Sequence, residues 1–117
     1  MSFKQSEDYC KKWKSELVSI LSEKENKFVY RLVERTDFDY LEINAFIGLT
    51  SLNETSGKYY WVDGSPLKYT CWKEGEPNHS DTRKCVFMAL DSGEWVTENC
   101  ITMRAPPVCK RLNPDAS

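Results

Sequence analysis

Apolar residues recur at helical spacing in two stretches near the start of the chain. The first stretch predicts a helix over residues 7–14, capped by Ser6. Its apolar stripe consists of Tyr9, Cys10 and Trp13. The second helix begins at Ser22, which forms a capping box with Glu25, and extends to about Arg35. We expect its inner face to contain Phe28, Val29, Leu32 and Val33.

The remaining apolar residues form short runs separated by turn residues, which is typical of β-strands. These runs lie at residues 16–21, 45–50, 59–62, 85–90, 94–96 and 107–111. Gly48, inside the second run, indicates close backbone packing. Residues 66–84 have little periodicity and predict a long loop, which is uncommon in a compact domain unless it has a function. Two helices followed by antiparallel strands predict the α+β class.

Composition and charge restrict the class of protein. The chain has 117 residues, enough for one core, so we treat residues 1–117 as a single domain. Sixteen basic residues are interleaved with eighteen acidic ones and form no basic stripe, which argues against nucleic acid as a partner. No apolar run reaches the roughly 18 residues of a membrane span. The chain starts with polar residues, so we expect any targeting segment to lie upstream of it.

Five cysteines are many for a chain of this length: Cys10, Cys71, Cys85, Cys100 and Cys109. They contain no Cys-X-X-Cys pair, and His79 is the only histidine, so a structural zinc site has little support. A disulfide framework, and with it an extracellular location, explains them better. Four paired cysteines allow three connectivities, and the choice of the unpaired one raises this number to fifteen. One thiol is left over in every scheme.

Five short motifs follow one another along the chain: FIGL (46–49), WVDG (61–64), WKEGEPN (72–78), GEW (93–95) and PPVCK (106–110). Together with the cysteines they resemble the C-type lectin-like domain family over about residues 3–111. The family's N-terminal strand is mostly missing. The resemblance implies two helices, an antiparallel sheet and a long loop region. It also implies the disulfides Cys10–Cys109 and Cys85–Cys100, which leave Cys71 unpaired or available for a disulfide-linked dimer.

In sugar-binding members of this family, five side chains hold a calcium ion that also binds the sugar. Glu76 and Asn78 match two of these side chains, and Pro77 resembles the family's cis-proline. The other three positions fall on Arg83, Val96 and Thr97, none of which carries a carboxylate. Calcium takes six to eight oxygen ligands. We therefore expect no metal and no other cofactor at this loop.

Two sets of nearby residues resemble replacements for the missing donors. The loop is one residue shorter than the sugar-binding pattern, so Asp81 is displaced toward the place of the missing glutamate. If calcium binds, its ligands are expected to be Glu76, Asn78 and Asp81. Glu98 and Asn99 follow the mismatched pair, but a shift of two residues along a strand is about 6.6 Å, which is too far for coordination.

The favoured hypothesis is a binding module, in a secreted protein or a receptor ectodomain, that recognises its partner without calcium. The partner is expected to be a protein, contacted by the long loop around Tyr69, Glu74, His79, Asp81 and Arg83. The alternative is a calcium-dependent lectin that binds a glycan through Glu76-Pro77-Asn78. A third hypothesis is a structural role in an oligomer linked through Cys71.

Other sequence features bear on these hypotheses. Asn53 and Asn78 each begin an N-glycosylation sequon, which predicts a glycoprotein. Catalysis is not expected, because the carboxylates of Asp91 and Glu94 flank a turn and have no nucleophile-and-base constellation beside them. The framework tryptophans form either a sugar-stacking platform or part of the core, and their positions favour the core: Trp61, Trp72 and Trp95.

Overall fold

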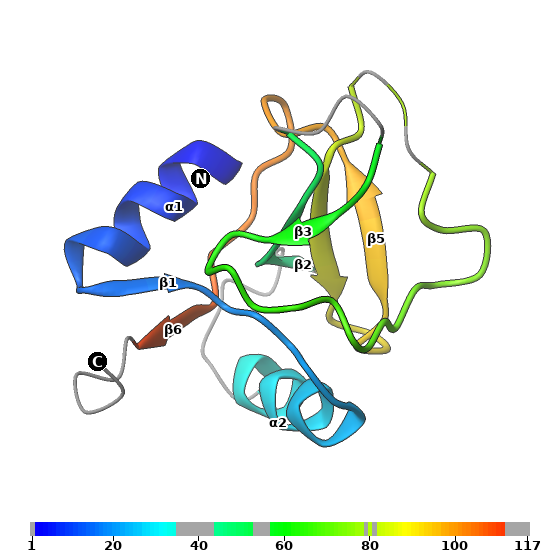
Figure 1. The fold of residues 1–117 in the computed structure, drawn as a ribbon, viewed down its shortest axis with the longest axis horizontal. Helices are drawn as coiled ribbons and strands as arrows, with labels where there is room; N and C mark the ends of the chain where they lie inside the picture. The colour runs from blue at the N-terminus through cyan, green and yellow to red at the C-terminus, as the bar shows by residue number, and fades with distance from the viewer. Residues whose placement is uncertain (1, 35–43, 53–56, 79, 81, 112–117) are drawn as a thin grey trace.

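A computed structural model describes residues 2–34, 44–52, 57–78, 80 and 82–111 (Figure 1). Along the chain, the elements are α1 (Phe3–Lys12), β1 (Ser15–Leu17), α2 (Glu23–Glu34), β2 (Asn44–Thr50), β3 (Tyr60–Trp61), β4 (Cys85–Ala89), β5 (Trp95–Glu98) and β6 (Cys109–Arg111). The strands form two antiparallel sheets: β1 pairs with β6, and the larger sheet has the order β3-β2-β4-β5. The predicted α+β class is confirmed.

Helix α1 begins four residues earlier than the sequence predicts, and the prediction of Ser6 as N-cap is wrong. Ser2 is the N-cap: its hydroxyl accepts from Gln5 N (3.3 Å), and Gln5 Oε1 accepts from Ser2 N (2.9 Å). This capping box satisfies donors that would otherwise lack partners. Phe3 is then buried edge-on against Phe46, with ring centroids 5.7 Å apart, and Ser6 is buried within the helix.

Helix α2 begins where the sequence predicts, but only half of its predicted inner face is buried. Val29 and Val33 are buried, whereas Phe28 is 67% exposed and Leu32 is 49% exposed. Positions 29 and 33 lie one above the other on the helix, and positions 28 and 32 lie about 100° to the side. The exposed pair borders a shallow cavity of about 280 Å³ between α2 and the segment around Val18.

The centre of the fold is β2, where backbone segments approach each other closely. Gly48 N donates to Val18 O (2.8 Å), and a Cβ at Gly48 would lie 2.8 Å from Leu17 O. Only glycine fits this contact, as the sequence indicated. Strand β1 is shorter than predicted because Val18 N pairs instead with Val108 O (2.8 Å), outside the regular ladder.

Two disulfides tie the ends of the fold together. Cys10 of α1 is bonded to Cys109 of β6, across 99 residues, and Cys85 of β4 is bonded to Cys100, across 15 residues. These are the two pairs that the family resemblance implied. In Figure 1, α1 and the β1–β6 pair lie to one side of the larger sheet. Within the described residues, neither helix is long and apolar enough to cross a membrane.

Candidate ligand-binding site on the long loop

The segment between β3 and β4 is the long loop that the sequence predicts, and backbone hydrogen bonds hold its middle against β5. Trp95 N donates to Cys71 O (2.8 Å), and Lys73 N donates to Trp95 O (3.0 Å). Trp72 and Trp95 are thereby paired in an isolated parallel bridge. The described residues of the loop contain no regular strand, so turns and irregular backbone set the positions of its side chains.

Aromatic rings fix the base of this loop onto the sheet. Trp95 is fully buried, and three rings contact it edge-on at centroid distances of 5.5, 5.8 and 5.8 Å: those of Trp61, Tyr69 and Trp72. Trp95 Nε1 also donates to Asn26 Oδ1 on α2 (2.9 Å). Trp61 is only 2% exposed. The interpretation as core residues rather than a sugar platform is confirmed for Trp61 and Trp95, whereas Trp72 is half-buried.

Glu76 lies where the loop meets β5, and one of its carboxylate oxygens accepts three hydrogen bonds from the protein. Glu76 Oε1 accepts from Thr97 N (2.9 Å), from the Thr97 hydroxyl (2.5 Å) and from Asn78 N (3.0 Å). Thr97 Oγ1 in turn accepts from Asn78 N (3.1 Å). The peptide bond between Glu76 and Pro77 is cis. The Glu76–Thr97 contact therefore joins the loop to β5.

The described residues offer few of the free oxygen atoms that the calcium ion associated with this loop by the resemblance would need. Calcium needs several free oxygen ligands at about 2.3–2.6 Å, whereas Glu76 Oε1 already accepts from N–H and O–H donors. The Val96 side chain has no oxygen, and the buried Thr97 hydroxyl donates to Glu76. In the part of the chain that the structure describes, no three His, Cys, Asp or Glu side chains form a group that could hold a metal ion.

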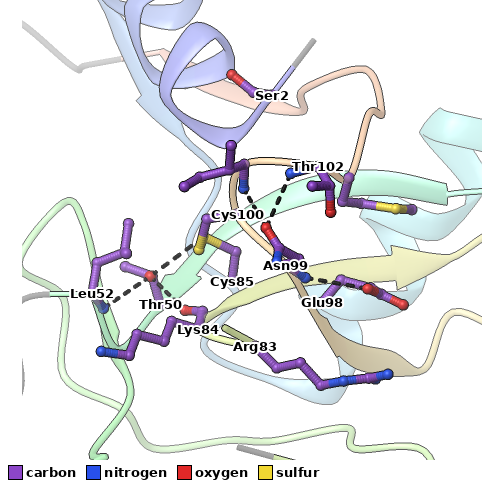
Figure 2. The surroundings of a disulfide bond; sticks show 12 residues. Ser2, Thr50, Leu52, Arg83, Lys84, Cys85, Glu98, Asn99, Cys100 and Thr102 are labelled. Carbon is purple, nitrogen blue, oxygen red and sulfur yellow. Dashed lines mark hydrogen bonds between the residues drawn. A yellow bond between two sulfur atoms is a disulfide. The ribbon is translucent and has the colours of Figure 1, made fainter. Parts of the chain in front are cut away.

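Glu98 and Asn99 do not replace the missing donors. Figure 2 shows both residues beside the Cys85–Cys100 disulfide, at the end of β5. Asn99 Oδ1 accepts from Ile101 N (2.8 Å) and Thr102 N (3.0 Å), so this side chain closes the turn after β5. Glu98 Oε2 accepts from Asn99 N (3.2 Å).

Arg83 occupies the position that the resemblance assigns to a calcium-binding glutamate. Its backbone is held on both sides: Arg83 N donates to Ser80 Oγ (3.1 Å), and Arg83 O accepts from the Tyr59 hydroxyl (3.3 Å). Figure 2 shows the side chains of Arg83 and Lys84 extending in opposite directions just before β4. This part of the loop therefore presents cations at a defined place.

The other residues predicted to contact a partner differ in how exposed they are. Tyr69 is half-buried against Trp95; burial, together with a hydrogen bond to Cys71, raises its pKa to about 12. Glu74 and Asn78 are exposed. The predictions for His79, Asp81 and Asn53 concern residues outside those that the structure describes. Cys71 is a free thiol and is half-buried.

Thr97 is the residue of this site that sequence reasoning missed. The sequence identified it only as a position from which a metal ligand is absent. Strand β5 alternates buried and half-buried residues, so the inward direction of Thr97 could be read from the pattern. The hydrogen bond from Thr97 to Glu76 could not be predicted from the pattern, because this contact depends on the path of the loop.

Known proteins resemble this chain in both sequence and structure. The family described as Lectin C-type domain matches residues 1–111. The low affinity immunoglobulin epsilon Fc receptor of Mus musculus is 34% identical over 103 residues, which are 88% of this chain and 29% of that receptor. The C-type mannose receptor 2 of Mus musculus is 31% identical over 113 residues, which are 96% of this chain and 7% of that receptor. The chain thus spans less than a third of either relative.

A solved structure extends the similarity to the fold. The cow C-type carbohydrate-recognition domain of CD23, crystallised in the presence of an oligosaccharide, superposes with a TM-score of 0.81 at 32% identity. The superposition covers 97% of this chain and 81% of the cow domain. The motifs, the two disulfides, the fold and these similarities agree, and the chain belongs to the C-type lectin domain family.

Proposed function

We propose that this domain binds a protein partner outside the cell through its long loop, and that it does so without calcium. The observation that carries the proposal is the hydrogen bonding of Glu76, whose Oε1 accepts from Thr97 N, from Thr97 Oγ1 and from Asn78 N. The two disulfides support an oxidising, extracellular location. A recognition domain of this kind needs no catalytic group, and we propose binding rather than catalysis.

The energetics of the Glu76 contacts disfavour a metal at this carboxylate. A calcium ion that used Glu76 Oε1 would have to displace the Thr97 hydroxyl, which is fully buried and has no access to water. A buried polar group that loses its partner costs about 1–3 kcal/mol. Calcium affinity also rises with the number of carboxylates, and Thr97 and Arg83 supply none.

The loop provides a pre-organised surface for a protein partner. Its base is fixed by the rings around Trp95, and the segment at Glu76 is held to β5 by the Glu76–Thr97 contact. Ordering of loops and side chains is one of the main costs of association, so a loop that is already held in place binds with a smaller entropic loss. Exposed Glu74 and cationic Arg83 offer charges of both signs to a partner.

A calcium-dependent lectin remains the second candidate. Glu76 and Asn78 are still adjacent across a cis peptide bond, and the similar cow domain was crystallised in the presence of an oligosaccharide. The two candidates differ in whether the folded domain binds the metal. They therefore make opposite predictions for its thermal stability in calcium.

Thermal unfolding with and without calcium tests the calcium part of the proposal. A ligand that binds only the native state stabilises it by RT ln(1 + [L]/Kd). We expect the melting temperature to be the same in millimolar calcium and in excess chelator. An increase in calcium that the chelator reverses, together with calcium-dependent signals on a glycan array, would establish the lectin in place of our proposal.

Binding to an array of extracellular proteins tests the protein partner. We expect a signal that persists in chelator and is lost when Glu74 and Arg83 are both replaced by alanine. A variant with Lys4→Ala and Asp8→Ala, on the exposed surface of α1, serves as the matched control and should keep the signal. A signal lost equally in both variants, or one that depends on calcium, would contradict the proposal.

A further inference from the structure

A basic patch surrounds the C-terminal end of α1, remote from the long loop. We define it by four exposed cations: Lys11, Lys12, Lys14 and Arg111. In Figure 1, α1 and β6 lie on one side of the molecule, and the yellow-green loop after β3 lies on the other. Lys11, Lys12 and Lys14 lie close together in the sequence, and the fold brings Arg111 beside them.

The disulfide between α1 and β6 explains how Arg111 joins the three lysines. Cys109 and Arg111 are two residues apart in β6, so their side chains project from the same face of the strand. Cys109 is bonded to Cys10 of α1, and this face therefore points at the helix. Arg111 is paired with Ser15, the residue directly after Lys14.

Within the described residues, none of the four cations of the basic patch forms an ion pair with a neighbouring acid. The described part of the chain contains two ion pairs, Lys4–Asp8 and Lys27–Glu23, and neither involves a cation of the patch. Glu7 attracts Lys11 without forming an ion pair. The patch is thus a concentrated positive surface on a chain whose net charge is −2.

Two aromatic side chains lie among these cations and are exposed to an unusual degree. Trp13 is 62% exposed and Tyr9 is 42% exposed, and their rings are 6.4 Å apart. Both belong to the apolar stripe that the sequence predicts for this helix, but of its three residues only Cys10 is buried. Beside them is an open groove of about 530 Å³, lined by Gln5, Asp8, Tyr9, Lys12 and Arg104.

We propose that the basic patch binds a sulfated polysaccharide of the heparin type. Sulfate groups take charge-assisted hydrogen bonds from lysine and arginine, and a short lysine-rich segment is typical of heparin-binding surfaces. Trp13 and Tyr9 provide flat apolar faces against which sugar rings pack, and the groove beside Lys12 provides space for the chain. This binding uses neither the long loop nor calcium, so it is independent of the function proposed above.

Heparin affinity of the whole chain tests this inference. The patch variant carries Lys11→Gln, Lys12→Gln, Lys14→Asn and Arg111→Gln; asparagine is chosen because residue 14 has a φ of +55°, which asparagine tolerates. The control variant replaces four exposed lysines elsewhere by glutamine, with the same change in net charge: Lys24, Lys58, Lys68 and Lys73. We expect the patch variant to bind heparin at least about tenfold more weakly and the control to stay within about twofold of wild type.

Two further comparisons separate a specific site from general polyanion binding. Trp13→Ala keeps every charge, and we expect it to weaken heparin binding while leaving the salt dependence of binding unchanged. Desulfated heparin is expected not to bind. Equal losses in the patch and control variants, binding of desulfated heparin, or competition by polyphosphate as effective as that by heparin would each overturn the proposal. Thermal unfolding of every variant verifies that it is folded.

Discussion

Glu76 and Thr97 show, at the scale of single residues, how a hydroxyl in place of a carboxylate changes the chemistry around it. Two carboxylates near each other repel, unless a cation lies between them or one of them takes up a proton. A threonine hydroxyl instead donates to the remaining carboxylate and accepts from a neighbouring N–H, as Thr97 does with Glu76 and Asn78. The loop is thereby connected to β5 by the protein's own donors.

Replacing Thr97 by valine tests this contact. Valine has nearly the same shape but cannot donate to Glu76, so Thr97→Val is expected to lower the free energy of unfolding by about 1–3 kcal/mol. Urea denaturation measures the change. Thr102→Val, at an exposed position in the turn after β5, is the control and should alter stability by less than about 0.5 kcal/mol. Equal effects of the two substitutions would show that the Thr97 hydroxyl contributes nothing.

Asp63 gives a prediction for pH dependence. Asp63 Oδ2 accepts from Ser19 Oγ (2.5 Å), and Oδ1 accepts from Ser65 N (2.9 Å). Partial burial raises the pKa of Asp63, but these hydrogen bonds and the charge of Lys110 together lower it more, so its pKa lies below the ordinary value. The stabilisation from Asp63 is therefore complete above the pKa of the unfolded chain and is lost as pH falls through the lower folded value.

Asp63→Asn is expected to reduce the melting temperature at neutral pH, and the difference from wild type should shrink as the solution is acidified. Melting curves recorded from neutral to strongly acidic pH measure this difference. Asp91→Asn, at an exposed turn position, is the control. A difference that stays constant with pH would contradict the assigned role of the Asp63 carboxylate.

At the scale of elements, the sequence predicts where helices and strands lie better than where they end. The order of two helices and the later strands follows from hydrophobic spacing, as does the position of the loop. The start of α1 was missed because Phe3 is isolated in the sequence and its burial against Phe46 is a tertiary contact. The exposure of Trp13 was missed because helical spacing alone assigns an aromatic residue to the apolar stripe, whether or not another element covers it.

The disulfides differ in how much of the chain they restrict. In the chain-entropy account, the Cys10–Cys109 loop of 99 residues contributes about 4–5 kcal/mol and the Cys85–Cys100 loop of 15 residues about 3 kcal/mol. Replacing both cysteines of the longer loop by serine is expected to destabilise the domain more than the same change in the shorter loop. Denaturant titration of the two double variants provides the comparison, and the reverse order would argue against an entropic origin.

At the scale of the whole molecule, Cys71 is the thiol through which a disulfide-linked dimer could form. Its thiol is half-buried and packs against the core cluster that contains Trp95, which limits its access to a second chain. We expect the native chain to be a monomer without reducing agent and to alkylate slowly until urea unfolds it. Mass measurement under non-reducing conditions tests this. A dimer that disappears in Cys71→Ser would show instead that the thiol links two chains.

The bond between Cys10 and Cys109 has a mechanical consequence for a domain inserted in a longer protein. A pulling force applied at the two ends passes through this covalent link from α1 to β6. The chain between the two cysteines, which are 99 residues apart in the sequence, therefore does not carry the load. A load carried by this bond does not stretch the residues between Cys10 and Cys109, so the long loop would keep its shape under tension.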